Sequence, residues 1–215
     1  REFIKMGTPK KFIIVVFFVF MNAIFFSMNS FGFDAVKKLK SMKVCRKCNM
    51  VGVDLRGANL KKTDLKGSNL SGAKLMEANL QGAKLEKAYL QTTDLTGANL
   101  VSSDMQKAYL NEANLKKANL SGANIKRAHL KGASLEDANL RGASLNGANL
   151  SGADLDRANL HEVNLQGANL QGVSFKGTDL SKANLIGTNV KKNEVKDAIL
   201  CKTKTPWGED NTDCK

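Results

Sequence analysis

The residues best suited to chemistry are four cysteines, which lie in two pairs near the ends of the chain. Cys45 and Cys48 enclose an arginine and a lysine, a C-x-x-C spacing in which the two cations would favour a reactive thiolate. A redox motif of the thioredoxin type needs a strand–helix–strand setting, and no such pattern surrounds these residues. We therefore predict a structural disulfide there and a second one between Cys201 and Cys214. A long cysteine-free segment separates the pairs, which argues against one shared zinc site.

Other catalytic sets are hard to find in this sequence. The chain has only two histidines, His129 and His161, and it contains no G-x-S-x-G, P-loop, H-E-x-x-H or dinucleotide-binding motif. Its carboxylates are scattered rather than grouped. We therefore predict no catalytic, cofactor-binding or metal-binding residues, and we do not expect an enzyme.

Composition indicates an unusual core and a basic surface. The 215 residues include 33 Lys and Arg against 20 Asp and Glu, a formal net charge of +13. Nine of the ten phenylalanines lie at or before Phe33, and only Phe175 comes later. The body of the chain must therefore build its core almost without large rings.

The N-terminal segment has the composition of an export signal. Two lysines at 10–11 precede an apolar run, and no charge occurs across residues 12–33. Ser30 and Gly32 supply the small residues of a cleavage site. We predict that residues 1–32 form a signal peptide, with a membrane anchor at 12–33 as the alternative. Either places the rest of the chain in the periplasm or outside the cell, where disulfides persist.

A five-residue repeat dominates the remaining sequence. Position 50 and every fifth residue to 200 give 31 positions, and 25 of them are Leu. A small residue lies two residues before nearly all of them, Ala at 20 of the 31, and the residue between is usually Asn or Asp. The exceptions to Leu are all apolar: Met50, Met105, Ile125, Phe175, Val190 and Val195.

This spacing fits neither a helix nor a plain strand. Five residues turn an α-helix by about 500°, so successive leucines would lie about 140° apart and form no stripe. An odd spacing also fails in a strand, whose side chains alternate with period two. Steps of two and then three residues fit short extended segments joined by corners. Glycine, frequent at the second variable position, suits tight turns that need a positive φ.

The uninterrupted A-N-L-x-x register resembles the pentapeptide repeat protein family. The resemblance implies an all-β fold, a right-handed quadrilateral β-helix over residues 48–200, with four repeats per coil and nearly eight coils. An open solenoid needs caps, so we predict a short amphipathic helix with the first cysteine pair at 33–47. A disulfide-closed cap is expected at 201–215, with Trp207 over the last leucine layer.

Alignment of residues 20 apart exposes two outward columns. One is a run of asparagines, which we predict to be a structural ladder: Asn59, Asn79, Asn99, Asn119, Asn139 and Asn159. The other carries aromatic rings beside cations and is a candidate surface strip: Lys87, Tyr89, Lys107, Tyr109, Arg127 and His129. Its rings and cations suit an anionic polymer or glycan. The alternative is internal duplication, with the rings contributing only to stability.

These observations favour a binding role over catalysis. The best-known activity of the family is protection of DNA gyrase by mimicry of DNA, which needs a negative surface. Without residues 1–32 the net charge is 29 − 19 = +10, so gyrase and DNA mimicry are not expected. We predict an exported, monomeric, non-enzymatic scaffold or interaction module without a small-molecule cavity. Its partner would be a protein or an anionic polymer, and a membrane only if residues 12–33 are retained.

Overall fold

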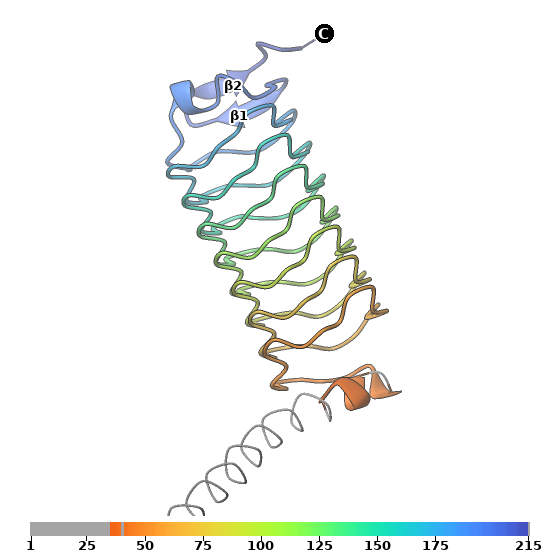
Figure 1. The fold of residues 1–215 in the computed structure, drawn as a ribbon. Helices are drawn as coiled ribbons and strands as arrows, with labels where there is room; N and C mark the ends of the chain where they lie inside the picture. Colours follow the sequence, from red (N-terminus) through yellow and green to blue (C-terminus); the bar gives the residue numbers. More distant parts are fainter. Residues whose placement is uncertain (1–34, 40, 215) are drawn as a thin grey trace, which may run out of the picture.

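The computed structural model describes residues 35–39 and 41–214, and it shows one elongated solenoid. The chain climbs in flat coils from the N-terminal end to the C-terminal end (Figure 1). The predicted signal peptide or anchor lies outside the described residues. Within the described part, no helix is long and apolar enough to cross a bilayer.

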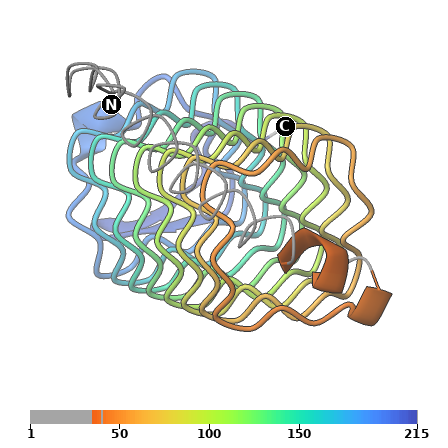
Figure 2. The ribbon, with the colours of Figure 1, turned by 60° about the horizontal axis from the view of Figure 1, so that its bottom comes forward.

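Each coil contains 20 residues, as four pentapeptides per coil require. Parallel bridges join residues 20 apart, beginning with Val44 and Asp64 and ending with Asn184 and Lys204. At about 4.8 Å per stacked strand, these eight steps make a rod roughly 38 Å long. The four sides of successive coils lie above one another when the N-terminal end of the rod is turned toward the viewer (Figure 2). The right-handed sense of the coil stays an expectation from the family resemblance.

The inward positions are those that the repeat predicts. Leu65, Leu120 and Leu160 are at most 1% exposed, and Ala83 and Ala123 are fully buried between the leucine layers. The regular bridges begin at Val44, four residues before the predicted start of the β-helix.

The corners are tight turns with a positive φ at the second variable position. In a typical corner, the Ala58 N–H donates to the Leu55 carbonyl (3.1 Å) across Gly57, whose φ is 61°. This pattern is that of a type II turn. Glycine is not required, because Lys107 holds a φ of 58° and Asp137 holds the same value. Each such residue tolerates a backbone region that costs about 1 kcal/mol.

Both ends of the rod are closed by short irregular segments. Within the predicted cap of 33–47, the described residues 35–39 and 41–42 are helical and cover the first coil. At the other end, a 3-10 helix η1 (Lys192–Glu194) precedes the antiparallel hairpin of β1 (Thr203–Thr205) and β2 (Gly208–Asp210). Trp207 lies at the hairpin turn and remains 38% exposed, whereas Thr203 and Thr205 are the buried residues of the hairpin. The expectation that Trp207 covers the last leucine layer stays a prediction.

Candidate functional site

Both predicted cysteine pairs are disulfide-bonded in the structure. Cys45 and Cys48 join with an S–S distance of 2.05 Å, and Cys45 fills the inward apolar position of its repeat. Both cysteines follow the cap helix and lie in the first coil, whose bridges begin at Val44, so the bond spans one corner of that coil.

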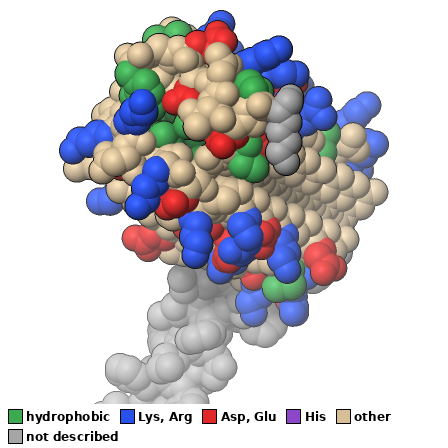
Figure 3. All heavy atoms as spheres, turned by 90° about the horizontal axis from the view of Figure 1, so that it is seen from above, with side chains coloured by type: hydrophobic (Ala, Val, Ile, Leu, Met, Phe, Trp, Pro, Cys, Tyr) green, Lys and Arg blue, Asp and Glu red, His purple; other side chains and the backbone are tan. Residues whose placement is uncertain are grey.

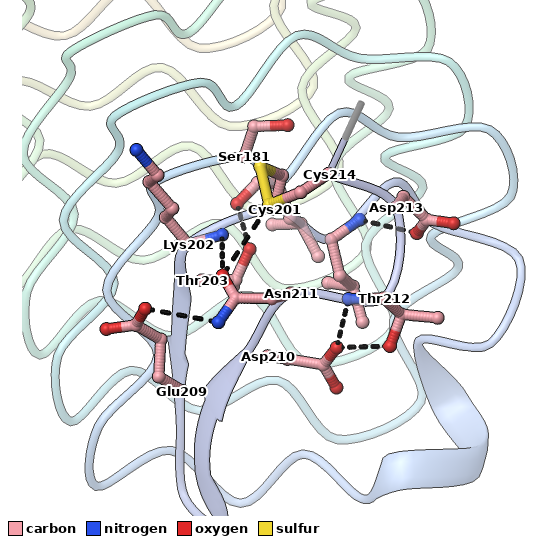
Figure 4. Close-up of a disulfide and its surroundings, with 12 residues drawn as sticks. Ser181, Cys201, Lys202, Thr203, Glu209, Asp210, Asn211, Thr212, Asp213 and Cys214 are labelled. Carbon is pink, nitrogen blue, oxygen red and sulfur yellow. Dashed lines mark hydrogen bonds between the residues drawn. A yellow bond between two sulfur atoms is a disulfide. The ribbon is translucent and has the colours of Figure 1, made fainter.

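The second disulfide, Cys201–Cys214, has an S–S distance of 2.09 Å and closes the C-terminal hairpin onto the last coil (Figure 4). The side chain of Asn211 stabilises the loop by accepting from the Lys202 N–H at 2.9 Å. Asp213 anchors the other end, where its carboxylate accepts from the Leu200 N–H at 2.8 Å. Bonds of this kind make the segment a cap.

The three rings of the predicted strip form one stacked column. The ring centroids of Tyr89 and Tyr109 lie 4.9 Å apart with planes at 7°, and those of Tyr109 and His129 lie 4.9 Å apart with planes at 4°. Parallel bridges join the same residues through the backbone. The predicted column is therefore confirmed as geometry.

The stacking restricts how a ligand could use these rings. A ring inserted between two others needs van der Waals contact of about 3.5–4.0 Å on each side, or roughly 7 Å in all. The observed 4.9 Å leaves no room for it. The strip therefore offers ring edges, two phenol hydroxyls and the imidazole nitrogens, none of which has a hydrogen-bond partner among the described residues. Insertion of a ligand ring between neighbouring rings of the column is therefore excluded.

The rings replace a side chain that elsewhere stabilises the turn. In most repeats the middle Asn or Asp accepts from the backbone N–H two residues later, as Asn119 does from Ser121 at 3.1 Å. Tyrosine cannot make this bond, and the corresponding N–H groups of Gln91 and Asn111 have no acceptor among the described residues. The two tyrosines therefore forgo hydrogen bonds that contribute about 0.5–1.5 kcal/mol each.

The same bond explains the asparagine column. Each of its six amide oxygens accepts from the backbone N–H two residues later, at 3.0–3.2 Å. The column is structural, as predicted. We had expected the amides to hydrogen-bond to one another along the rod. Their hydrogen bonds instead close the turns.

The cations beside the rings lie in a parallel column at the turn positions. Arg127 stacks over the next coil, because a Cβ added to Gly147 would lie 3.5 Å from its Cγ. Lys87 lies 4.0 Å from Glu86, which also pairs with Lys66 at 2.9 Å, and the Lys66 hydrogen bond lowers the pKa of Glu86. Lys107 and Arg127 have no ion pair with any described residue. This side of the rod is therefore basic and partly uncompensated.

A second group of charges is self-neutralising. Arg157 donates to Asp137 at 2.8 Å and also to Glu136, which pairs with Lys116 at 2.7 Å. Hydrogen bonds from Lys116 and Arg157 lower the pKa of Glu136, and the bond from Arg157 lowers that of Asp137. These paired groups form a network of ion pairs on the surface, and none of them has the raised pKa of a catalytic acid.

One surface cavity was not predicted. The bridges on one side stop at Ser174, because η1 turns the chain away, and a cavity of about 330 Å³ opens between residues 172–176 and Glu194 and Asp197. The N–H of Phe175 has no acceptor there among the described residues. This hollow is open to solvent rather than enclosed, so the expectation of no small-molecule cavity stays a prediction. The hollow lies outside the leucine interior, and both of its carboxylates are exposed.

In the part of the chain that the structure describes, no three His, Cys, Asp or Glu side chains are grouped to hold a metal ion. His161 lies 3.3 Å from Glu162 and 3.9 Å from Asp179, which makes a small polar cluster on the surface.

Stacked four-sided coils with an Ala and Leu interior define a β-solenoid, and the comparisons identify its family. The chain belongs to the pentapeptide repeat family. The family model, described as Pentapeptide repeats (8 copies), matches six overlapping ranges: 44–75, 73–111, 93–132, 123–161, 133–172 and 158–192. No curated protein sequence matches the chain significantly.

Solved structures of the same family are similar to the chain. HetL from the cyanobacterium Nostoc sp. strain PCC 7120, a protein involved in heterocyst differentiation regulation, is 27% identical with a TM-score of 0.45, over 81% of this chain and 96% of HetL. AT2G44920 from the Arabidopsis thaliana thylakoid lumen is 36% identical with a TM-score of 0.21, over 46% of this chain and 66% of that one. QnrB1, a plasmid-mediated fluoroquinolone resistance protein, is 17% identical with a TM-score of 0.46, over 72% of this chain and 82% of that one.

Proposed function

We propose that the chain is an exported, non-enzymatic rod that acts as a scaffold or interaction module through its outer surface. One observation carries the proposal: the interior is filled along its length by Leu and Ala side chains, nearly all of them at most 3% exposed. A close-packed interior of this kind admits no ligand. Recognition must therefore use the sides or the ends of the rod.

Two features support export. The sequence before residue 34 has the order of a signal peptide, and all four cysteines are paired in disulfides. Structural disulfides persist in oxidising compartments and are rare in the cytosol. A pull-down from an envelope extract, with the exported chain as bait and washes of increasing salt, tests the binding role. Recovery of a macromolecule in stoichiometric amount is expected. Turnover of a substrate by the purified chain would contradict the proposal.

A second candidate function is binding of an anionic polymer or glycan along the strip. The observation that favours it is the loss of the turn hydrogen bond at both tyrosines, together with the absence of ion pairs for Lys107 and Arg127 among the described residues. Ring edges and hydroxyls would donate to the polymer while the cations neutralise it. Affinity for such a ligand falls steeply with salt.

Other repeats of the chain show which residue can replace the tyrosines of the strip. Tyr89→Asn with Tyr109→Asn installs the residue common at this position and restores the turn bond, so the fold should persist. Polymer affinity should fall at least tenfold in this variant. A matched control, Asn149→Ala, lies in the same column and should leave affinity unchanged. Equal affinity of the wild type and the double variant would remove the strip from the binding site.

A further inference from the structure

The two ends of the rod differ strongly in charge. Residues 35–66, apart from residue 40, contain nine Lys and Arg and only two acidic residues, Asp54 and Asp64. Residues 191–214 at the other end contain five Lys and five acidic residues. Figure 3, which looks at the C-terminal end, shows charges of both signs mixed together. The excess of positive charge therefore lies at the N-terminal end.

Most of the N-terminal cations have no carboxylate partner in the described chain. Three of the nine form ion pairs, Arg46 with Asp64, Arg56 with Asp54 and Lys66 with Glu86. The other six are exposed lysines with no carboxylate of the described residues within 4.0 Å: Lys37, Lys38, Lys43, Lys47, Lys61 and Lys62. All six lie in the cap or in the first residues of two adjoining coils. They are thus within about 10 Å of the end of the rod along its axis.

Apolar side chains are exposed among these lysines. Met42 in the cap is 65% exposed, and in the first coil Val44 is 41% exposed and Val51 is 55% exposed. A soluble polyanion would neutralise the lysines and gain nothing from these side chains. A bilayer surface offers both anionic headgroups and an apolar boundary, and basic surfaces with apolar side chains bind it for both reasons.

We propose that the N-terminal end of the rod docks on a bilayer that contains anionic lipids, so that the rod stands out from the membrane. Six lysines within about one Debye length of the headgroups all experience the negative surface potential. The uncharged residues 12–33 directly precede this end, so an anchor there would place the same surface against the bilayer. The proposal concerns only the docking surface. It does not depend on export or on the partner bound along the sides.

Lysine acetylation of the full chain tests this proposal without altering the fold. The chain is mixed with phosphatidylcholine vesicles that contain or lack phosphatidylglycerol, and the acetylation rate of each lysine is read by mass spectrometry. We expect at least roughly fivefold protection of the six lysines by the anionic vesicles only, since each such lysine contributes about 1 kcal/mol at the surface. Lys191 and Lys192 at the opposite end should react equally with both vesicles. Salt near 1 M should abolish the protection.

Matched variants sharpen the result. Changing Lys43, Lys47, Lys61 and Lys62 to Gln should expose Lys37 and Lys38 to acetylation on anionic vesicles. Changing four C-terminal lysines to Gln removes the same charge and should preserve that protection: Lys191, Lys192, Lys196 and Lys202. Equal rates with both vesicle types would overturn the proposal. So would protection by soluble polyphosphate with none by anionic vesicles, which would assign the end to a soluble polyanion.

Discussion

Ser103 is a buried residue whose replacement should stabilise the rod. Its hydroxyl is fully buried and has no hydrogen-bond partner among the described residues. The residues in the same position one coil before and after, Ala83 and Ala123, are also fully buried, so Ala fits this position. An unsatisfied buried hydroxyl costs about 1–3 kcal/mol. We therefore expect Ser103→Ala to raise the free energy of unfolding by about 1 kcal/mol, and Tm by about 2–4 °C.

The control is another buried serine whose hydroxyl is satisfied. Ser68 donates to the Leu65 carbonyl at 2.6 Å, so Ser68→Ala should lower stability by about 1 kcal/mol. Both variants are compared with the wild type by thermal and denaturant unfolding followed by circular dichroism. Opposite signs for the two serines support the assigned inward register. A loss of stability in Ser103→Ala equal to that in Ser68→Ala would refute the reasoning.

Three further perturbations have expected outcomes. Leu120→Lys places a charge at a position that is 1% exposed, so we expect more than about 4 kcal/mol of destabilisation and loss of β-type circular dichroism; an unchanged Tm would contradict the register. Replacing Cys201 and Cys214 by Ser opens a loop with a sequence separation of 13, which should cost about 3 kcal/mol and increase hydrogen exchange in the hairpin alone. The hydrogen bond from Arg56 lowers the pKa of Asp54 from 3.8 to about 2. Because the folded-state pKa is depressed, this contribution is complete above about pH 4 and is lost as the pH falls toward 2. The free energy of unfolding should therefore decline in that window during an acid titration. A decline already near pH 6 would exclude Asp54 as its cause.

The architecture was predictable because one constraint recurs without interruption. Every fifth residue from 50 to 200 is apolar, and an odd period is compatible with neither a helix nor a flat strand. Val190 and Val195 remain at most 5% exposed although the bridges at residues 189 and 194 are lost, so the inward register survives the break. The stacked column of Tyr89 and Tyr109 followed from the four repeats per coil that the family resemblance implies, since residues 20 apart then become neighbours.

The parts that were not predicted depend on local contacts that periodicity does not encode. The middle asparagines were expected to bond along the rod, but an amide oxygen reaches the N–H two residues later more directly. The cavity beside Phe175 arises because η1 turns away from the stack, and the sequence there still carries apolar residues at 190 and 195. Whether a ligand ring can enter between the rings of the strip depends on the ring spacing of 4.9 Å, which only the structure gives.

Intact-mass analysis of the chain recovered from its cells is the most direct test of an exported, disulfide-capped rod. The chain is alkylated without reductant, so that only free thiols gain mass. We predict no alkylation at Cys45, Cys48, Cys201 or Cys214, and either cleavage after Gly32 or recovery of the uncleaved chain in the membrane fraction. Two or more alkylated cysteines in an uncleaved chain from the cytosolic fraction would contradict this account.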